Sequence, residues 1–255
     1  MSERAVIVTG AAQGVGRATA ERLAASGWRV VAVDIDKERL AWAEEVAAVT
    51  PCVADVATEE GNAAAVDAAV EAAGRLDAVV LNAAVSLSGP IDQLDLADFD
   101  KMIAVNLRGP VLGIRAALPA LRRAGGGAIA ITSSGHGLGG DPGFWAYAAT
   151  KHGVVGLVRS LARELGHEGI RINAVCPSAI RGTGMSGPLE HVAPEMFAAI
   201  AEAIPLRRWC TADEVAAVLE FLISPASSYV NGVALPVDGG ALAGSGLLPP
   251  AKPAG

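Results

Sequence analysis

The stretch AVIVTGAAQGVGRATAERLAASG, residues 5–27, decides the fold of this chain. Its first six residues form a short apolar run that predicts a buried strand, and its last ten have the pattern of an amphipathic helix. Gly10, Gly14 and Gly16 lie between them, where glycine lets the backbone turn sharply and approach a pyrophosphate at the helix N-terminus. By itself, such a turn fits a dinucleotide site and a plain strand-to-helix connection equally well.

The acid that ends the next strand bears on the choice of dinucleotide. Residues 29–34, RVVAVD, form a second apolar strand that ends in Asp34, eighteen positions after Gly16. A carboxylate at this place accepts hydrogen bonds from both ribose hydroxyls of an adenosine and repels a 2′-phosphate. The glycine turn contains no lysine or arginine, and Ile35 and Asp36 offer a phosphate no positive charge. The sequence therefore predicts NAD(H) rather than NADP(H).

Strand and helix patterns alternate through the rest of the chain. Further strands are predicted at 51–55, 78–81, 126–132, 170–175 and 232–237, and further helices at 38–48, 58–74, 96–123, 144–166 and 213–223. This alternation predicts an α/β fold with one domain: a Rossmann-type, doubly wound parallel sheet of about seven strands with helices on both faces. The domain is expected to cover residues 1–243, with the irregular stretch 178–209 as a substrate loop or lid and 244–255 as a C-terminal tail.

Composition excludes several classes of protein. Hydrophobic residues make up 52% and charged residues 18% of the 255, which excludes disorder, and the long uncharged runs are interrupted by glycine, proline or serine, which excludes a membrane-spanning helix. The net charge of −7 argues against nucleic-acid or anionic-membrane partners. Three cysteines without CxxC spacing fit reduced thiols in a cytoplasmic protein, and neither they nor the histidines have the spacing of metal ligands.

Tyr147 and Lys151 are the candidate proton-transfer pair. Four positions apart in a helical segment, they lie on the same face of the helix. An ammonium roughly 4 Å from a phenol, at an effective dielectric of about 20, favours the phenolate by about 4 kcal/mol and lowers the phenol's pKa by about three units. Tyr147 would then act as an acid/base near neutral pH. The alternative is an ordinary surface pair.

Polar residues at the ends of predicted strands are further candidates. Asp55 would lie beside an adenine amino group or cap the next helix. Asn82 ends another strand, and Ser133 and Ser134 follow a third, where open α/β sheets bind ligands. Asn106 lies in mid-helix, where an amide is unfavourable unless it has a partner or faces solvent.

Taken together, the motifs resemble the short-chain dehydrogenase/reductase family over nearly the whole chain. The resemblance is carried by Thr9-Gly-x-x-x-Gly14-x-Gly16, Asp55-Val56, Asn82-Ala83-Ala84, Asn106, Ser134, Tyr147-x-x-x-Lys151, Pro177 and Asp238-Gly239-Gly240. The thirteen-residue interval before Tyr147 favours Ser134 over Ser133. Agreement at so many spacings strongly disfavours the surface-pair interpretation of Tyr147 and Lys151.

The resemblance implies roles for these residues. Lys151 would bind the nicotinamide ribose and lower the pKa of Tyr147, Ser134 would hold the substrate oxygen, and Asn106 would fix a water that relays the proton. The cofactor contacts predicted from the residues and the resemblance together are Gly10, Gln13, Gly14, Val15, Gly16, Asp34, Ile35, Asp55, Val56, Asn82, Ala83, Ala84, Tyr147, Lys151, Pro177, Ile180 and Thr183.

One loop departs from the family's pattern. The family has glycine after the proline and threonine five positions beyond it, whereas Ser178 follows Pro177 here and the threonine, Thr183, lies six positions beyond. Thr183 reaches the carboxamide only if Gly182 lets the loop bulge. Ile180 is the safer backbone contact.

Three residues are candidates for substrate contact. His136 and Trp145 flank the predicted site in sequence, and Arg181 in the lid is a candidate partner for an anionic group. The leading hypothesis is NAD-dependent oxidation of a secondary alcohol. The alternatives are the reverse reaction, ketone reduction by NADH, and a non-catalytic dinucleotide sensor. By the resemblance, the apolar faces 116–121 and 154–165 would join copies of the chain into a homotetramer.

Overall fold

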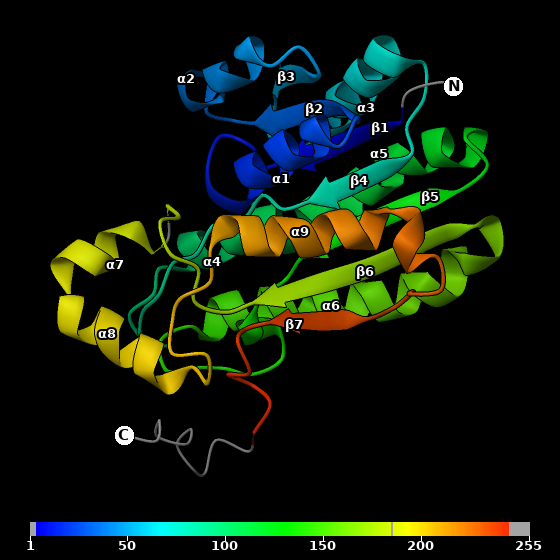
Figure 1. The fold of residues 1–255 in the computed structure, drawn as a ribbon. Coiled ribbons are helices and arrows are strands. Elements are labelled where there is room, and N and C mark those ends of the chain that lie inside the picture. The colour runs from blue at the N-terminus through cyan, green and yellow to red at the C-terminus, as the bar shows by residue number, and fades with distance from the viewer. Residues whose placement is uncertain (1–3, 185, 245–255) are drawn as a thin grey trace.

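A single parallel sheet forms the centre of the molecule (Figure 1). The computed structural model describes residues 4–184 and 186–244. Within these residues the sheet has seven strands, in the order β3-β2-β1-β4-β5-β6-β7, all parallel. The strands are β1 (Ala5–Thr9), β2 (Arg29–Asp34), β3 (Val49–Val53), β4 (Ala78–Leu81), β5 (Gly127–Thr132), β6 (Ile170–Pro177) and β7 (Ala234–Val237).

Helices connect successive strands and pack on the sheet. The α-helices are α1 (Gly14–Ala25), α2 (Lys37–Leu40), α3 (Glu59–Ala73), α4 (Leu96–Met102), α5 (Gly109–Arg123), α6 (Trp145–Leu165), α7 (Gly187–Val192), α8 (Pro194–Ala203) and α9 (Ala212–Ile223). Short 3₁₀ helices, such as η1 (Ala41–Glu45) and η3 (Gly135–Gly137), and a π-helix, η2 (Ile103–Arg108), complete the described part.

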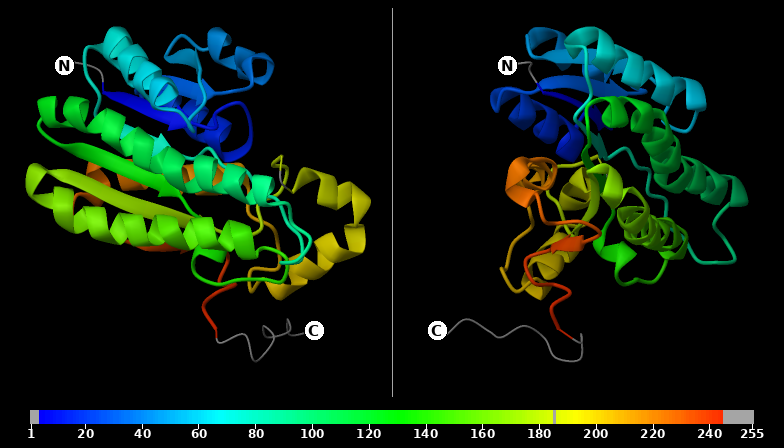
Figure 2. Two further views of the ribbon diagram at one scale, coloured as in Figure 1. Left: turned by 180° about the vertical axis from the view of Figure 1, so that it is seen from behind. Right: turned by 90° about the vertical axis from the view of Figure 1, so that its right-hand side faces the viewer.

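Alternating side chains divide the interior into two hydrophobic cores. In β5, Ala128 and Ala130 face the core that α1 and α9 cover, while Ile129 and Ile131 face the core that α3, α5 and α6 cover. The two layers of helices are seen from behind and from the side in Figure 2. The predicted doubly wound sheet with helices on both faces is therefore confirmed.

The carboxyl ends of the strands meet at one edge of the sheet, where α7 and α8 project as a separate lobe (Figure 1). Both helices lie within the predicted lid, residues 178–209. Because all strands are parallel, polar residues that end different strands come together at this edge. It is the edge that carries the candidate site.

Two predicted elements were wrong in extent. In place of the helix predicted at 38–48, the structure has the short α2 followed by η1. Asp36 caps α2, and the indole of Trp42 donates a hydrogen bond to the Ala11 carbonyl at 3.1 Å, which holds this connection against the sheet. The strand predicted at 51–55 lies two residues earlier, at 49–53, paired with β2. It is an edge strand, where proline at Pro51 is tolerated.

A π-helix interrupts the long helix predicted at 96–123. The last predicted helix is confirmed as α9, and Thr211 caps it in a capping box with Glu214. No described helix is long and apolar enough to cross a bilayer. The predicted tail, apart from Gly244, lies outside the described residues.

The helix faces predicted to join copies of the chain are largely used within it. Ala117 and Leu121 of α5 and Val154 and Val158 of α6 are buried in the chain's own core. Leu118, Leu157, Leu161 and Ala162 are only partly buried. The homotetramer stays a prediction.

Candidate active site

Two glycines of the turn between β1 and α1 have no room for a side chain. A Cβ on Gly16 would overlap the Gly10 carbonyl oxygen, and one on Gly10 would lie 2.8 Å from the Ala83 Cα. Gly10 and Gly14 also have positive φ angles, 68° and 55°, which other residues rarely adopt. Gln13 is the N-cap of α1, but its side chain makes no capping hydrogen bond. The first turn of α1 therefore leaves backbone N–H groups for an anionic ligand, which fits a dinucleotide pyrophosphate.

Asp34, at the carboxyl end of β2, is held beside this turn. Its two carboxylate oxygens accept from the Ala12 N–H at 2.9 Å and the Asp36 N–H at 3.1 Å. A basic residue that the sequence analysis missed also lies here, since the Arg39 guanidinium donates to Gln13 Oε1 at 3.1 Å. Arg39 lies five residues beyond Asp34, and the prediction of NAD(H) considered charges only up to Asp36.

Three polar side chains join the ends of the central strands. The Thr9 hydroxyl accepts from the N–H groups of Asn82 (2.9 Å) and Ala83 (3.1 Å). The Asn82 amide in turn donates to the Thr9 carbonyl at 3.1 Å and accepts from the Thr132 hydroxyl at the same distance. These bonds fix the ends of β1, β4 and β5 relative to one another. Ala84 continues the segment, partly buried.

The remaining predicted cofactor residues lie around the same edge. Asp55 is exposed and accepts from the Ala57 N–H at 2.8 Å, and Thr58 rather than Asp55 caps α3. Val56, next to it, is partly buried. Pro177, which ends β6, is buried. Val15 is buried in α1, whereas Ile35 after β2 is exposed.

The irregular loop after β6 reaches the glycine turn. Gly182 has a φ of 71°, and the Thr183 Cγ2 lies 3.5 Å from where a Cβ of Gly14 would be. Gly182 therefore gives the loop a left-handed residue, and the contact of Thr183 with the carboxamide stays a prediction. Ile180 forms a bridge to Cys210 and is fixed at the base of the lid.

Tyr147 and Ser134 lie together in a buried cluster. Ser134 follows β5 and Tyr147 lies in the first turn of α6, and each is only 8% exposed. Burial raises the pKa of Tyr147 to about 12, and a hydrogen bond with Ser134 partly opposes the rise. The phenol is therefore protonated at neutral pH.

Lys151 is almost wholly buried, one turn of α6 after Tyr147. Its Nζ lies 5.5 Å from the centroid of the Tyr147 ring and donates to the Thr132 carbonyl at 2.8 Å. Burial lowers the pKa of Lys151 to about 8. The sequence predicted that this ammonium lowers the pKa of Tyr147 below its ordinary value. That prediction was wrong for the protein without cofactor, because burial of the phenol raises the pKa.

Asn106 uses its side chain to hold the segment after β4. Its Oδ1 accepts from the Val85 N–H and its Nδ2 donates to the Val85 carbonyl, both at 2.8 Å. Nδ2 also lies 3.3 Å from the Thr150 hydroxyl of α6. The side chain thus positions the segment after β4 relative to α6, and the water-binding role predicted for Asn106 stays a prediction.

The chain is similar in sequence and structure to known oxidoreductases. A family model described as enoyl-(acyl carrier protein) reductase matches residues 10–241. Levodione reductase of Leifsonia aquatica is 39% identical over 251 residues, 94% of each chain, and a levodione reductase crystal structure superposes with a TM-score of 0.89 at 39% identity, over 95% of this chain and 99% of that one. The chain belongs to the short-chain dehydrogenase/reductase family.

Further relatives show the range of this family. Meso-2,3-butanediol dehydrogenase of Serratia marcescens is 36% identical over 249 residues, 95% of this chain and 96% of the relative. The structure of a 3-ketoacyl-(acyl-carrier-protein) reductase from Brucella melitensis, complexed with NADH, superposes with a TM-score of 0.86 at 32% identity, over 94% and 98% of the two chains. As a family member, the chain is an oxidoreductase that acts on alcohols or ketones with a nicotinamide dinucleotide.

All three residues predicted to contact substrate in this short-chain dehydrogenase/reductase have contacts within the chain. The Trp145 indole donates to the Gly89 carbonyl at 3.2 Å, and its ring stacks on Phe99. The Arg181 guanidinium forms an ion pair with Glu190 within the lid. His136 lies next to Tyr147, with ring centroids 5.8 Å apart.

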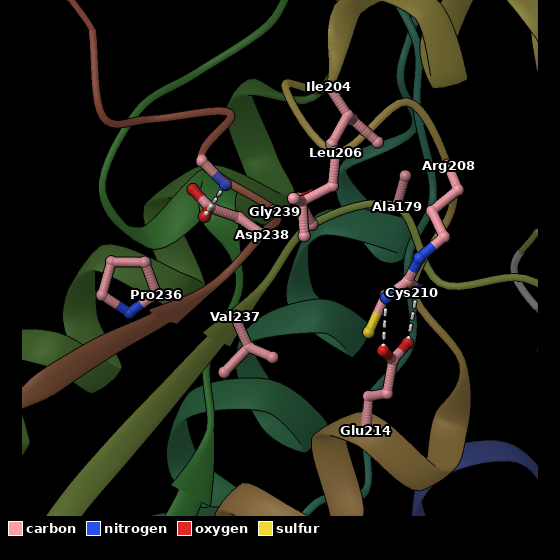
Figure 3. A pocket seen from close by; sticks show the side chains of 12 residues that line it. Ala179, Ile204, Leu206, Arg208, Cys210, Glu214, Pro236, Val237, Asp238 and Gly239 are labelled. Atoms are coloured by element: carbon pink, nitrogen blue, oxygen red, sulfur yellow. Dashed lines mark hydrogen bonds and ion pairs between the residues drawn. The ribbon is translucent and has the colours of Figure 1, made fainter.

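A cavity of about 500 Å³ lies beyond the carboxyl ends of β6 and β7. Figure 3 shows the Arg208–Glu214 ion pair on one side of it and the Asp238-Gly239 turn on the other. The Asp238 carboxylate accepts from the N–H groups of Gly240 and Leu242, both at 2.9 Å, which shapes the turn after β7. Of the described residues that line this cavity, none belongs to the Ser134–Tyr147–Lys151 cluster.

The buried ammonium predicts a pH-dependent stability difference between the wild type and Lys151→Met. The pKa of Lys151 is about 8 in the folded chain and 10.5 as its ordinary value, so below pH 8 the folded protein carries the full cost of burying the charge. As the pH rises from 8 to 10.5, the folded protein has lost the proton that the unfolded chain still binds, and this cost is relieved. We expect the free energy of unfolding of the wild type to rise by about 2–3 kcal/mol relative to that of Lys151→Met between pH 7 and pH 10.

Urea unfolding of both proteins at pH 7 and pH 10 measures this difference. Because Tyr147 is present in both proteins, its own titration largely cancels. A stability difference that is equal at the two pH values would contradict the lowered pKa of Lys151.

Proposed function

We propose that the protein transfers a hydride between a secondary alcohol, or the corresponding ketone, and NAD(H), with Tyr147 as the acid/base. The observation that carries the proposal is the buried Tyr147, whose pKa the nearby Ser134 side chain lowers, one helical turn before the buried Lys151. Burying an ammonium is costly, and such groups are concentrated at functional sites. This cost counts against a sensor that binds a dinucleotide without catalysis.

Each residue of the cluster has a separate part in the proposed reaction. The Ser134 hydroxyl holds the reacting oxygen of the substrate, and the Tyr147 phenol exchanges a proton with that oxygen. Lys151 holds the ribose of the cofactor and adds positive charge beside the phenol. When bound, the nicotinamide accepts or supplies the hydride.

Alcohol oxidation is the leading direction, and one observation favours ketone reduction as the second candidate. Oxidation needs Tyr147 as phenolate, whereas its pKa of about 12 keeps it protonated at neutral pH. A protonated phenol is the form that donates to the oxygen of a ketone as the hydride arrives. The same residues serve both directions, and the rate of alcohol oxidation is expected to rise at alkaline pH.

NAD rather than NADP is proposed because of the place of Asp34. Its carboxylate, at the end of β2 beside the glycine turn, provides acceptors for ribose hydroxyls and repels a 2′-phosphate. The nearby Arg39 is the feature that opposes this choice, but its guanidinium lies 3.4 Å from Asp36 and is partly neutralised. Solved structures of relatives contain either NADH or NADP, so the proposal of NAD rests on Asp34.

Tyr147→Phe tests the acid/base. Removing the phenol hydroxyl removes the proton donor, so we expect kcat to fall at least about 100-fold, while binding of NADH, measured by fluorescence titration, is retained. The matched control is Tyr229→Phe, since Tyr229 is fully exposed and apart from the cluster. Full activity in Tyr147→Phe would refute the mechanism, and NADH binding without turnover of any alcohol or ketone in the wild type would support the sensor.

Asp34→Ala tests the cofactor. Loss of the carboxylate removes the ribose acceptors and the repulsion of a 2′-phosphate, so we expect the ratio of kcat/KM for NAD to that for NADP to fall at least about tenfold. Asp67→Ala, on the exposed face of α3, is the control. An unchanged ratio in Asp34→Ala would contradict the assignment of NAD.

We also propose a cytoplasmic homotetramer, as the family resemblance implies. The partly buried side chains of α5 and α6, among them Leu118, Leu157 and Leu161, offer apolar area for contact between copies. Sedimentation velocity at micromolar concentration is expected to give a species of four chains. A single-chain species would contradict the proposal.

A further inference from the structure

His136 places an imidazole ring beside the proposed acid/base. It belongs to η3, and its backbone N–H donates to the Ser134 hydroxyl at 3.1 Å. Its ring stacks on Phe144, with centroids 4.9 Å apart, and meets the Tyr147 ring edge-on. These contacts fix the imidazole next to the hydroxyl groups that would hold the reacting oxygen.

The Nε2 of this ring has no hydrogen-bond partner among the described residues, although it is buried. Asp141 Oδ2 lies 3.0 Å from it. This distance permits a hydrogen bond, so the carboxylate must lie off the direction of the ring N–H. A buried polar group without a hydrogen bond destabilises the free protein. A substrate oxygen placed along the direction of the ring N–H would form that bond and remove the destabilisation.

The Asp141 carboxylate can move away from the imidazole, because its side chain is 73% exposed in the loop between η3 and α6. When a substrate oxygen takes over Nε2, the carboxylate can turn into solvent at little cost. Its negative charge nevertheless stays near the imidazole and disfavours a second carboxylate there. The cation that the sequence suggested for an anionic substrate, Arg181, is paired with Glu190. The surroundings thus favour an uncharged oxygen.

We propose that His136 is a specificity-determining residue that binds a second, uncharged oxygen of the substrate. The substrate class is then a diketone, a hydroxyketone or a diol rather than a simple alcohol or a hydroxy acid. The imidazole can donate to a ketone oxygen or, in its other tautomer, accept from a hydroxyl. Asp141 adds negative charge beside the ring without a hydrogen bond to Nε2, and it moves aside when substrate arrives. This inference rests on the proposed function, since it concerns the same site.

The test uses three ketones built on one ring: cyclohexanone, cyclohexane-1,4-dione and 4-oxocyclohexanecarboxylate. Their kcat/KM values for reduction with NADH are measured for the wild type and for His136→Phe, which keeps an aromatic ring against Phe144 and removes both nitrogens. We expect the wild type to prefer the dione to cyclohexanone, and the preference to fall at least about tenfold in His136→Phe. His167→Phe, in the 3₁₀ helix after α6 and far from the site, is the matched control with an unchanged preference.

Two further variants separate recognition from folding. His136→Gln keeps a polar group and should retain part of the preference, which a merely structural defect would not do. Asp141→Asn removes the negative charge, so we expect the ratio of kcat/KM for the keto acid to that for the dione to rise several-fold. Thermal melts of all variants show whether they fold.

The outcomes distinguish this inference from the function on which it rests. A wild type that reduces none of the ketones while binding NADH would contradict the proposed function itself. If the wild type reduces them but His136→Phe lowers kcat/KM for cyclohexanone and the dione by the same factor, the function stands and the role of His136 is refuted. A wild type that prefers the keto acid would also refute it.

Discussion

The buried ammonium of Lys151 is the group on which the arrangement of the site depends. It donates to the carbonyl of Thr132, the last residue of β5, and so ties the helix that carries Tyr147 to the end of the sheet. A charge in this position needs a partner, because an unpaired buried ammonium would destabilise the fold. The bond therefore holds the one charge of the catalytic cluster at the sheet edge where a cofactor would reach it.

Polar bonds of the same kind complete the edge of the sheet. Thr9, Asn82 and Thr132 link three central strands, and Asn106 joins the segment after β4 to α6. The side chains of Thr9, Asn82 and Asn106 bond to backbone groups near the carboxyl ends of the strands, and the Thr132 hydroxyl donates to the Asn82 side chain. These bonds hold the backbone around the Ser134–Tyr147–Lys151 cluster in place, whereas His136 keeps one buried nitrogen without a hydrogen bond among the described residues.

Local patterns predicted most of the fold because each strand is a short apolar run. They failed between residues 38 and 55, where the extent of the helix and of the edge strand depends on pairing with β2 and on the contact between Trp42 and Ala11. Local patterns also predicted one continuous helix where the structure has α4, a π-helix and α5, because an amide such as Asn106 in mid-helix does not indicate a π-helix. Arg39 was missed because its approach to Gln13 follows from the tertiary fold.

The sequence by itself determined the family, and its glycine turn, Asp34 and Tyr147–Lys151 spacing predict a nucleotide site and a proton-transfer pair at one sheet edge. Only the tertiary structure decided the state of those groups. Burial, rather than the neighbouring lysine, sets the pKa of Tyr147, and an ion pair with Glu190 engages the charge of Arg181. The reason is that desolvation and pairing depend on neighbours from distant parts of the chain, which spacing along the sequence does not specify.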